Sequence, residues 1–178
     1  MIIFDKEKHE YTDITGSYKY IGITGIIKRA LRIEYGYTES YYREKGTLIH
    51  EDIEKGTFKY AESKWVKKEL EQRGVFVLGN EALVYDFPFA SKIDIIGANQ
   101  NNDIFLIDVK TGNFDRDYCT LQLSAYLELF NKTFPGKSGK SDIVLQVYCT
   151  KDKRVYPIIY RKGTLDYLKK FLNISIKN

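Results

Sequence analysis

The chain has 178 residues, of which 43% are hydrophobic and 15% aromatic, so it can bury a core and is not intrinsically disordered. Its 28 Lys and Arg residues against 24 Asp and Glu give a formal charge of +4, which is compatible with a nucleic-acid partner but does not by itself indicate one. The two cysteines, Cys119 and Cys149, exclude an iron–sulfur cluster, which needs four ligands.

The chain has no stretch that would divide it into domains or anchor it in a membrane. No apolar run approaches membrane-spanning length, and the first residues lack the apolar segment of a signal peptide. We therefore expect a cytoplasmic protein with no membrane partner. With no long linker in the chain, we expect one domain over 1–178, in which a strand and helix region, 1–73, packs on a core, 74–178.

Hydrophobic periodicity and turn residues predict the secondary structure in chain order. The first third reads as short strands followed by helices, the middle as strands, and the last third as helix, strands and helix. The predicted elements are helices over 24–32 (capped by Thr24), 39–55 and 57–73; strands over 75–78, 82–89, 92–98 and 104–110; a helix over 117–131; strands over 142–150 and 154–160; and a last helix capped by Thr164. This order predicts an α/β fold in which helices flank a central sheet.

The most informative segment is a predicted hairpin that turns at residues 99–103. Folding it about Asn101 places Asp94 directly opposite Asp108, where the Cβ atoms would be about 4.5–5.5 Å apart and like charges destabilise a sheet. Two carboxylates so placed call for a cation between them. One alternative is that both are ordinary solvent-facing residues. Another is a register slip of one residue, which would put them on opposite faces.

Hard carboxylate oxygens favour Mg²⁺ or Mn²⁺ as that cation. Lys110 lies two residues after Asp108 and so on the same face of the strand. Its ammonium group could orient an attacking water molecule and offset charge that develops on a phosphodiester.

Two helical pairs add candidate site residues. His50 is a possible metal ligand, and Glu54, one turn further along the helix, could orient it. Gln122 and Tyr126 are also four residues apart, and they could contact a phosphate or a base. The alternatives are a histidine of the surface or core and an ordinary polar helix face.

Five segments in order resemble the RecB-like branch of the PD-(D/E)XK nuclease superfamily. They are Gly46-Thr47-Leu48-Ile49-His50, Glu81, Ile93-Asp94, Asp108-Val109-Lys110-Thr111-Gly112 and Gln122-Leu123-Ser124-Ala125-Tyr126. The opening, with Phe4, His9 and Tyr11 followed by Ile23-Thr24-Gly25, is similar to small phage and mitochondrial exonucleases of this branch, although those usually carry Ser-Val-Thr where this chain has Gly22-Ile23-Thr24.

The resemblance implies a restriction-endonuclease-like core, a central mixed sheet flanked by helices, and roles for individual residues. Asp94, Asp108 and Lys110 would be catalytic. His50, Asp94, Asp108 and the backbone carbonyl of Val109 would hold Mg²⁺ or Mn²⁺. Gln122 and Tyr126 would position the DNA strand, and Glu81 would be either a site residue or a structural ion-pair partner.

The function that this resemblance implies is a metal-dependent DNA exonuclease acting on single strands or free ends. Because the chain carries no helicase motor, it would be freestanding and of viral origin, acting in the host cytoplasm. An endonuclease of the same superfamily is the first alternative. The second is a catalytically silent DNA-binding accessory protein on a nuclease fold, although such a protein would be free to lose Asp94, Asp108 and Lys110.

Overall fold

The computed structural model describes the whole chain except residues 7, 9, 34–38, 137–141 and 173–178, so His9 lies outside the described residues. Helices and strands follow one another as the sequence predicts, with three short strands at the N-terminus. The elements are β1 (Ile2–Asp5), β2 (Glu10–Asp13), β3 (Lys19–Gly22), α1 (Ile23–Ala30), α2 (Glu39–Glu54), α3 (Ala61–Gln72), β4 (Phe76–Asp86), β5 (Phe89–Ala98), β6 (Ile104–Lys110), α4 (Arg116–Thr133), β7 (Ile143–Cys149), β8 (Arg154–Ile158) and α5 (Thr164–Phe171).

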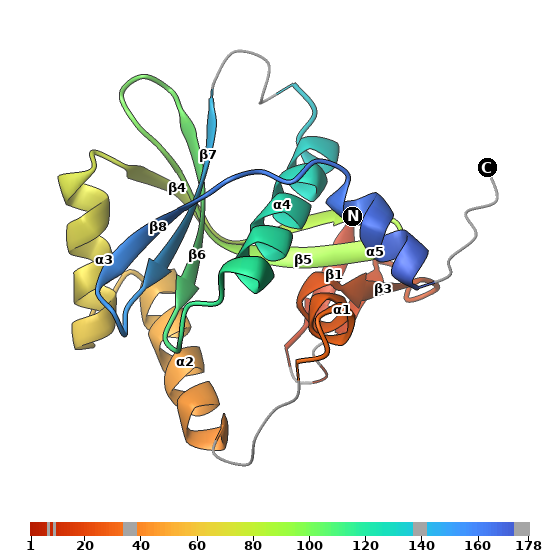
Figure 1. The fold of residues 1–178 in the computed structure, drawn as a ribbon, viewed down its shortest axis with the longest axis horizontal. Helices are drawn as coiled ribbons and strands as arrows, with labels where there is room; N and C mark the ends of the chain where they lie inside the picture. Colours follow the sequence, from red (N-terminus) through yellow and green to blue (C-terminus); the bar gives the residue numbers. More distant parts are fainter. Residues whose placement is uncertain (7, 9, 34–38, 137–141, 173–178) are drawn as a thin grey trace.

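The eight strands form one mixed sheet in the order β1-β2-β3-β5-β6-β7-β8, with β4 paired to β5. The β3–β5 and β6–β7 pairs are parallel, and the other pairs are antiparallel. Buried side chains of α1, α4 and α5 pack with one set of strand residues, and those of α2 and α3 pack with another. The sheet therefore lies between two helical layers (Figure 1), which confirms the predicted α/β class with a central mixed sheet flanked by helices.

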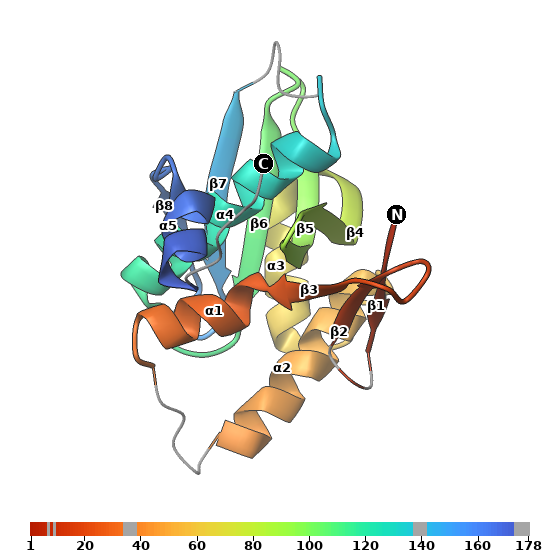
Figure 2. The ribbon, with the colours of Figure 1, turned by 90° about the vertical axis from the view of Figure 1, so that its right-hand side faces the viewer.

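The long strand β5 holds the sheet together, because it takes partners at both of its edges. One edge pairs with β4 along its whole length. The other edge pairs with β3 at Phe89 and Ala90 and with β6 from Ile95 onward. In the pairing that the structure describes, residues 91–94 have no strand partner at this second edge, so the sheet divides there. Figure 2 shows β3 leading directly into α1, with the β1–β2 hairpin at its other end.

Two predicted helix caps are wrong. α1 begins at Ile23, with Gly22 as its N-cap residue and Thr24 inside the first turn, because β3 runs into the helix without a loop. α5 is capped by Gly163, and Thr164 is its first residue. The α5 N-terminus is instead held by Glu128 of α4, whose carboxylate accepts hydrogen bonds from the backbone N–H groups of Gly163, Thr164 and Leu165 at 2.8–3.0 Å. A side chain distant in sequence supplies the cap.

The helix predicted over 57–73 starts four residues late, at Ala61. Buried Asp52, at the end of α2, accepts hydrogen bonds from the backbone N–H groups of Lys59 (2.7 Å) and Tyr60 (3.2 Å). It also accepts hydrogen bonds from the hydroxyls of Thr57 and Ser63. These bonds hold the chain in a turn before α3. Its other end agrees with the prediction, since Gly74 adopts a left-handed φ of 63° after the helix.

The two strands predicted over 75–78 and 82–89 are one strand, β4, with an irregularity between Val77 and Gly79. The second prediction also ran too far. Phe87 and Pro88 form the turn into β5, where proline, which has no N–H group to donate, needs no strand partner. Within the described ranges, no helix has the length and apolar character needed to cross a membrane.

Candidate metal and catalytic site

Strands β5 and β6 pair in the register predicted from the sequence. Ile95 lies opposite Ile107, which sets Asp94 opposite Asp108 one position further along. The pairing of backbone groups ends at Ile95, and beyond it the Asp94 carboxylate accepts a hydrogen bond from the backbone N–H of Val109 at 2.7 Å. Asp94 is therefore fixed at the point where the sheet divides.

Strand β4 adds a third carboxylate beside these two. Ala82 pairs with Ile93, so Glu81 lies opposite Asp94 on the other edge of β5. Glu81 has a φ of 50°, a left-handed conformation that is uncommon for a non-glycine residue and costs about 1–3 kcal/mol. Glu81, Asp94 and Asp108 thus form a row of acidic residues across three neighbouring strands.

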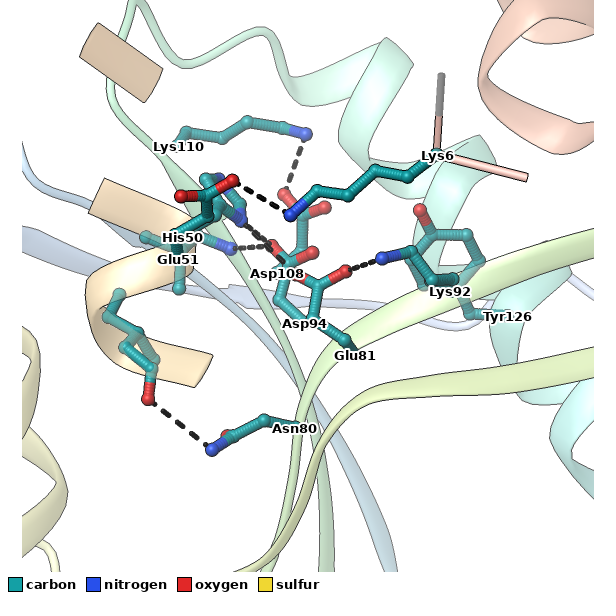
Figure 3. Close-up of polar contacts among 12 residues, drawn as sticks. Lys6, His50, Glu51, Asn80, Glu81, Lys92, Asp94, Asp108, Lys110 and Tyr126 are labelled. Carbon is teal, nitrogen blue, oxygen red and sulfur yellow. Dashed lines mark hydrogen bonds and ion pairs between the residues drawn. The ribbon is translucent and has the colours of Figure 1, made fainter. Parts of the chain in front are cut away.

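The helix α2 places His50 against this row (Figure 3). Its Nδ1 lies 3.7 Å from Glu81 Oε1 and 3.6 Å from Asp94 Oδ2. One possible ligand atom from each of the three residues lies within 4.8 Å of the others, as a shared metal ion requires. The interactions of His50 run to these two carboxylates, and Glu54 lies exposed at the rim, so the structure does not give Glu54 the orienting role expected of it.

Asp108 is only 2% exposed and faces Lys110. Lys110 Nζ lies 2.7 Å from Asp108 Oδ2, in ion-pair contact but without the alignment of a hydrogen bond. Asp108 Oδ2 is thus a buried carboxylate oxygen that accepts no hydrogen bond. Buried oxygens of this kind are rare in folded proteins, because each loses its hydration without a replacement.

Gln122 and Tyr126 of α4 hold Lys110 in place. Lys110 Nζ donates a hydrogen bond to Gln122 Oε1 at 2.8 Å, and Gln122 Nε2 donates one to the Tyr126 hydroxyl at 2.6 Å. Both α4 side chains are 2% exposed. The structure therefore makes them positioning residues for Lys110, and their expected contact with a DNA strand remains a prediction.

The crowding of charges shifts the pKa values of the site. Burial, reinforced by the charges of Asp108 and Glu81, raises the pKa of Asp94 to about 7. Burial opposes protonation of His50, but the neighbouring carboxylates of Asp94 and Glu81 prevail and raise its pKa to about 9. Burial also acts against the charge of Lys110, yet Asp108 raises its pKa, so the ammonium group stays charged. Without a metal, the site is protonated in part at neutral pH.

All of these residues line one cleft of about 430 Å³, where the sheet divides and α2, the β1–β2 hairpin and α4 converge. The cleft brings together every site residue predicted from the sequence: His50, Glu54, Glu81, Asp94, Asp108, Val109, Lys110, Gln122 and Tyr126.

The sequence reasoning missed two lysines of the cleft. Lys92 makes an ion pair with Glu81, and Lys6 makes one with Glu51 at 2.7 Å. A signal for Lys92 was available, because it lies two residues before Asp94 on a predicted strand. No local pattern could have placed Lys6, because it reaches the cleft only when the N-terminal hairpin docks beside α2.

Comparisons with known proteins assign no family to this chain. No protein-family model matches it, and no curated protein matches it. Among solved structures, one described as "Crystal structure of SSO0001" shares 15% identity over 88% of this chain and 77% of that chain, with a TM-score of 0.43. At that TM-score the match carries no argument about function.

Proposed function

We propose that this protein is a divalent-metal-dependent nuclease that hydrolyses phosphodiester bonds of DNA, and that it acts on free ends or single strands. The observation that carries the proposal is the convergence in one cleft of His50, Glu81 and Asp94, which could hold a metal ion, with buried Asp108 and the half-buried Lys110. The similarity of these residues to the RecB-like PD-(D/E)XK pattern supports it, including the restriction-endonuclease-like core.

The donor set fits Mg²⁺ or Mn²⁺. Three carboxylates provide hard oxygens and His50 provides one imidazole nitrogen. Asp108 lines the same cleft, and its Oδ2, buried beside Lys110 and accepting no hydrogen bond, is its candidate ligand atom. Glu81, expected only as a possible site residue, belongs to the ligand set under this proposal because of its distance to His50.

The residues of the cleft would have different roles in hydrolysis. Asp94, Asp108, Glu81 and His50 would hold the ion, which supplies Lewis-acid activation of the phosphodiester and of water. Lys110, fixed by Asp108 and Gln122, would place its positive charge where the transition state gains negative charge. The lysine is oriented before the substrate arrives, so little reorganisation opposes its action.

The test is incubation of linear and circular DNA, single- and double-stranded, with Mg²⁺ or Mn²⁺ and with EDTA. We expect metal-dependent degradation of linear DNA, no cutting in EDTA, and no cutting by Asp108→Asn. Asp166→Asn, an exposed carboxylate on α5, is the matched control and should cut as wild type.

The form of the products separates the alternatives. Survival of circles while linear DNA is degraded would establish an exonuclease, whereas linearised circles would establish an endonuclease. Binding of DNA without cutting under any metal would favour the silent accessory protein, and undiminished cutting in EDTA would refute the metal site.

A further inference from the structure

We propose that Lys92 is a second, movable phosphate-binding residue: it holds Glu81 while the site lacks metal and turns to the phosphodiester of the substrate once Glu81 ligates the ion. This inference rests on the proposed function and concerns a residue to which the RecB-like resemblance gives no role. Figure 3 shows Lys92 reaching Glu81 from the side of the cleft opposite His50.

The two oxygens of Glu81 face different cations. Oε1 lies 3.7 Å from His50 Nδ1, on the side of the metal-binding cluster. Oε2 is in ion-pair contact with the ammonium group of Lys92. A divalent ion held by Glu81 would therefore share the carboxylate with Lys92, and the two positive charges would repel each other at short range. Metal binding weakens the hold of Glu81 on Lys92.

Lys92 can move where Lys110 cannot. The two side chains are almost equally exposed, at 22% and 23%, so the difference lies in their partners. Besides Glu81, the Lys92 ammonium group contacts the face of the Phe4 ring, 4.7 Å from the ring centroid. A cation–π contact keeps the charge near the cleft without a fixed direction for its N–H donors. Lys110, in contrast, is held by both Asp108 and Gln122. Of these two lysines, Lys92 thus has the fewer directed contacts and can turn towards a ligand.

The charges of the contact network agree with this assignment. With His50 neutral, as a metal ligand must be, three carboxylates and two ammonium groups leave one negative charge. A single divalent ion makes the network positive by one, and a single phosphodiester makes it neutral. The network consists of His50, Glu81, Lys92, Asp94, Asp108 and Lys110. These six residues therefore balance one metal ion and one phosphate, and the other cleft charges, the Lys6–Glu51 pair and the exposed Glu54, add one negative charge.

The test measures metal binding and DNA binding separately in Lys92→Met. Titration calorimetry with Mn²⁺ alone should show binding about three- to tenfold tighter than in wild type, because a competing charge is gone. Fluorescence anisotropy of a labelled single-stranded oligonucleotide, with Mn²⁺ and in a Lys110→Ala background to suppress cleavage, should show binding at least about fivefold weaker, because a phosphate contact is lost. The two affinities should move in opposite directions.

Three further variants make the result specific. Lys92→Arg keeps the charge and should restore both affinities to near the wild-type values. Lys55→Met removes an exposed lysine that pairs with Glu51 at 3.6 Å and does not line the cleft, so it should change neither. Lys92→Gln serves in place of Lys92→Met if the latter does not fold, as judged by circular dichroism.

Each result decides the matter. Weaker Mn²⁺ binding in Lys92→Met would show that Lys92 only orients Glu81, and unchanged DNA binding would show that it does not contact phosphate. Either result overturns the inference while the proposed function stands. A wild-type protein that binds neither Mn²⁺ nor DNA would overturn the proposed function and this inference with it.

Discussion

Replacing Asp94 with Asn should stabilise the metal-free protein while removing its response to metal. Asn keeps the size of the side chain, and its amide oxygen can still accept the hydrogen bond from Val109 N–H. What the replacement removes is a negative charge that burial and the nearby Asp108 and Glu81 make unfavourable. An ordinary structural aspartate would give the opposite result.

The magnitude follows from the pKa of Asp94, which folding raises from 3.8 to about 7. At 1.36 kcal/mol per pKa unit, ionising this buried group costs the folded state about 4 kcal/mol. His50 loses an attractive partner in the variant, which reduces the gain. We therefore expect Asp94→Asn to raise the free energy of unfolding by about 2–4 kcal/mol at pH 8 without metal.

The pH dependence of stability tests the direction of this effect in a second way. Between pH 3.8 and about 7 the folded wild type binds more protons at Asp94 than the unfolded chain does, so its stability falls as pH rises through this window. Asp94→Asn lacks this fall. The two proteins should differ little near pH 4 and fully near pH 8.

The assay is urea unfolding of both proteins in EDTA at pH 4 and pH 8, repeated with Mn²⁺ at pH 8. Wild type should gain about 2.7 kcal/mol at a Mn²⁺ concentration of 100 times Kd, and Asp94→Asn much less. Marked destabilisation of Asp94→Asn in EDTA at pH 8, or equal stabilisation of both proteins by Mn²⁺, would refute the assignment of Asp94 to a metal site.

Three further predictions concern the lysine, the imidazole and the buried turn. Lys110→Ala should lower the cleavage rate by on the order of a hundredfold with DNA binding retained, since the lysine charge acts mainly in the transition state. Equal single-turnover rates for the variant and wild type would show that Lys110 is an ordinary surface residue. Mn²⁺ affinity should rise with pH from 6 to 8.5, because the ion must displace protons from His50, with a pKa of about 9, and from Asp94, with a pKa of about 7. Calorimetry in buffers of different ionisation enthalpy would detect the released protons. An affinity independent of pH would contradict these ligands. Asp52→Ala should lower the free energy of unfolding in urea by about 2–4 kcal/mol, because it leaves the N–H groups of Lys59 and Tyr60 without their acceptor. A decrease in this free energy below 0.5 kcal/mol, on the order of an ordinary surface substitution, would mean that water replaces Asp52.

The hairpin that carries Asp94 and Asp108 could be predicted because its register is fixed locally. The Asn99 side chain accepts hydrogen bonds from the backbone N–H groups of Asn101 and Asp103, so the turn itself sets which residues face each other. Buried Ile95 and Ile107 belong to the core cluster with α2 and α3, whereas their neighbours Ile96 and Leu106 belong to the cluster with α4. A slip of one residue would exchange these two sets between the packed faces of the sheet, which adds a second constraint.

Other features of the site depend on contacts between distant segments, which no local pattern encodes. The left-handed backbone of Glu81 is a property of the folded sheet, and glutamate has no preference for it. The late start of α3 depends on Asp52, and the cap of α5 depends on Glu128, some 35 residues earlier in the chain. Burial of Gln122 and Tyr126 follows from the packing of α4, whose sequence shows polar residues that the fold encloses.

The acidic row and the histidine reach the cleft by different routes, and this has a consequence for the choice of metal. Glu81, Asp94 and Asp108 lie on three consecutive strands of one continuous segment, whereas His50 arrives only when α2 docks against them. Carboxylate oxygens alone suit Mg²⁺, Ca²⁺ and Mn²⁺, while an added imidazole nitrogen extends the range to later ions such as Fe²⁺ and Zn²⁺. If the cleft holds an ion as proposed, the packing of a single helix would decide whether its ligands are oxygens alone or oxygens with one nitrogen, and a chain in which α2 stands away from the sheet would keep only the three carboxylates, which suit Mg²⁺, Ca²⁺ and Mn²⁺.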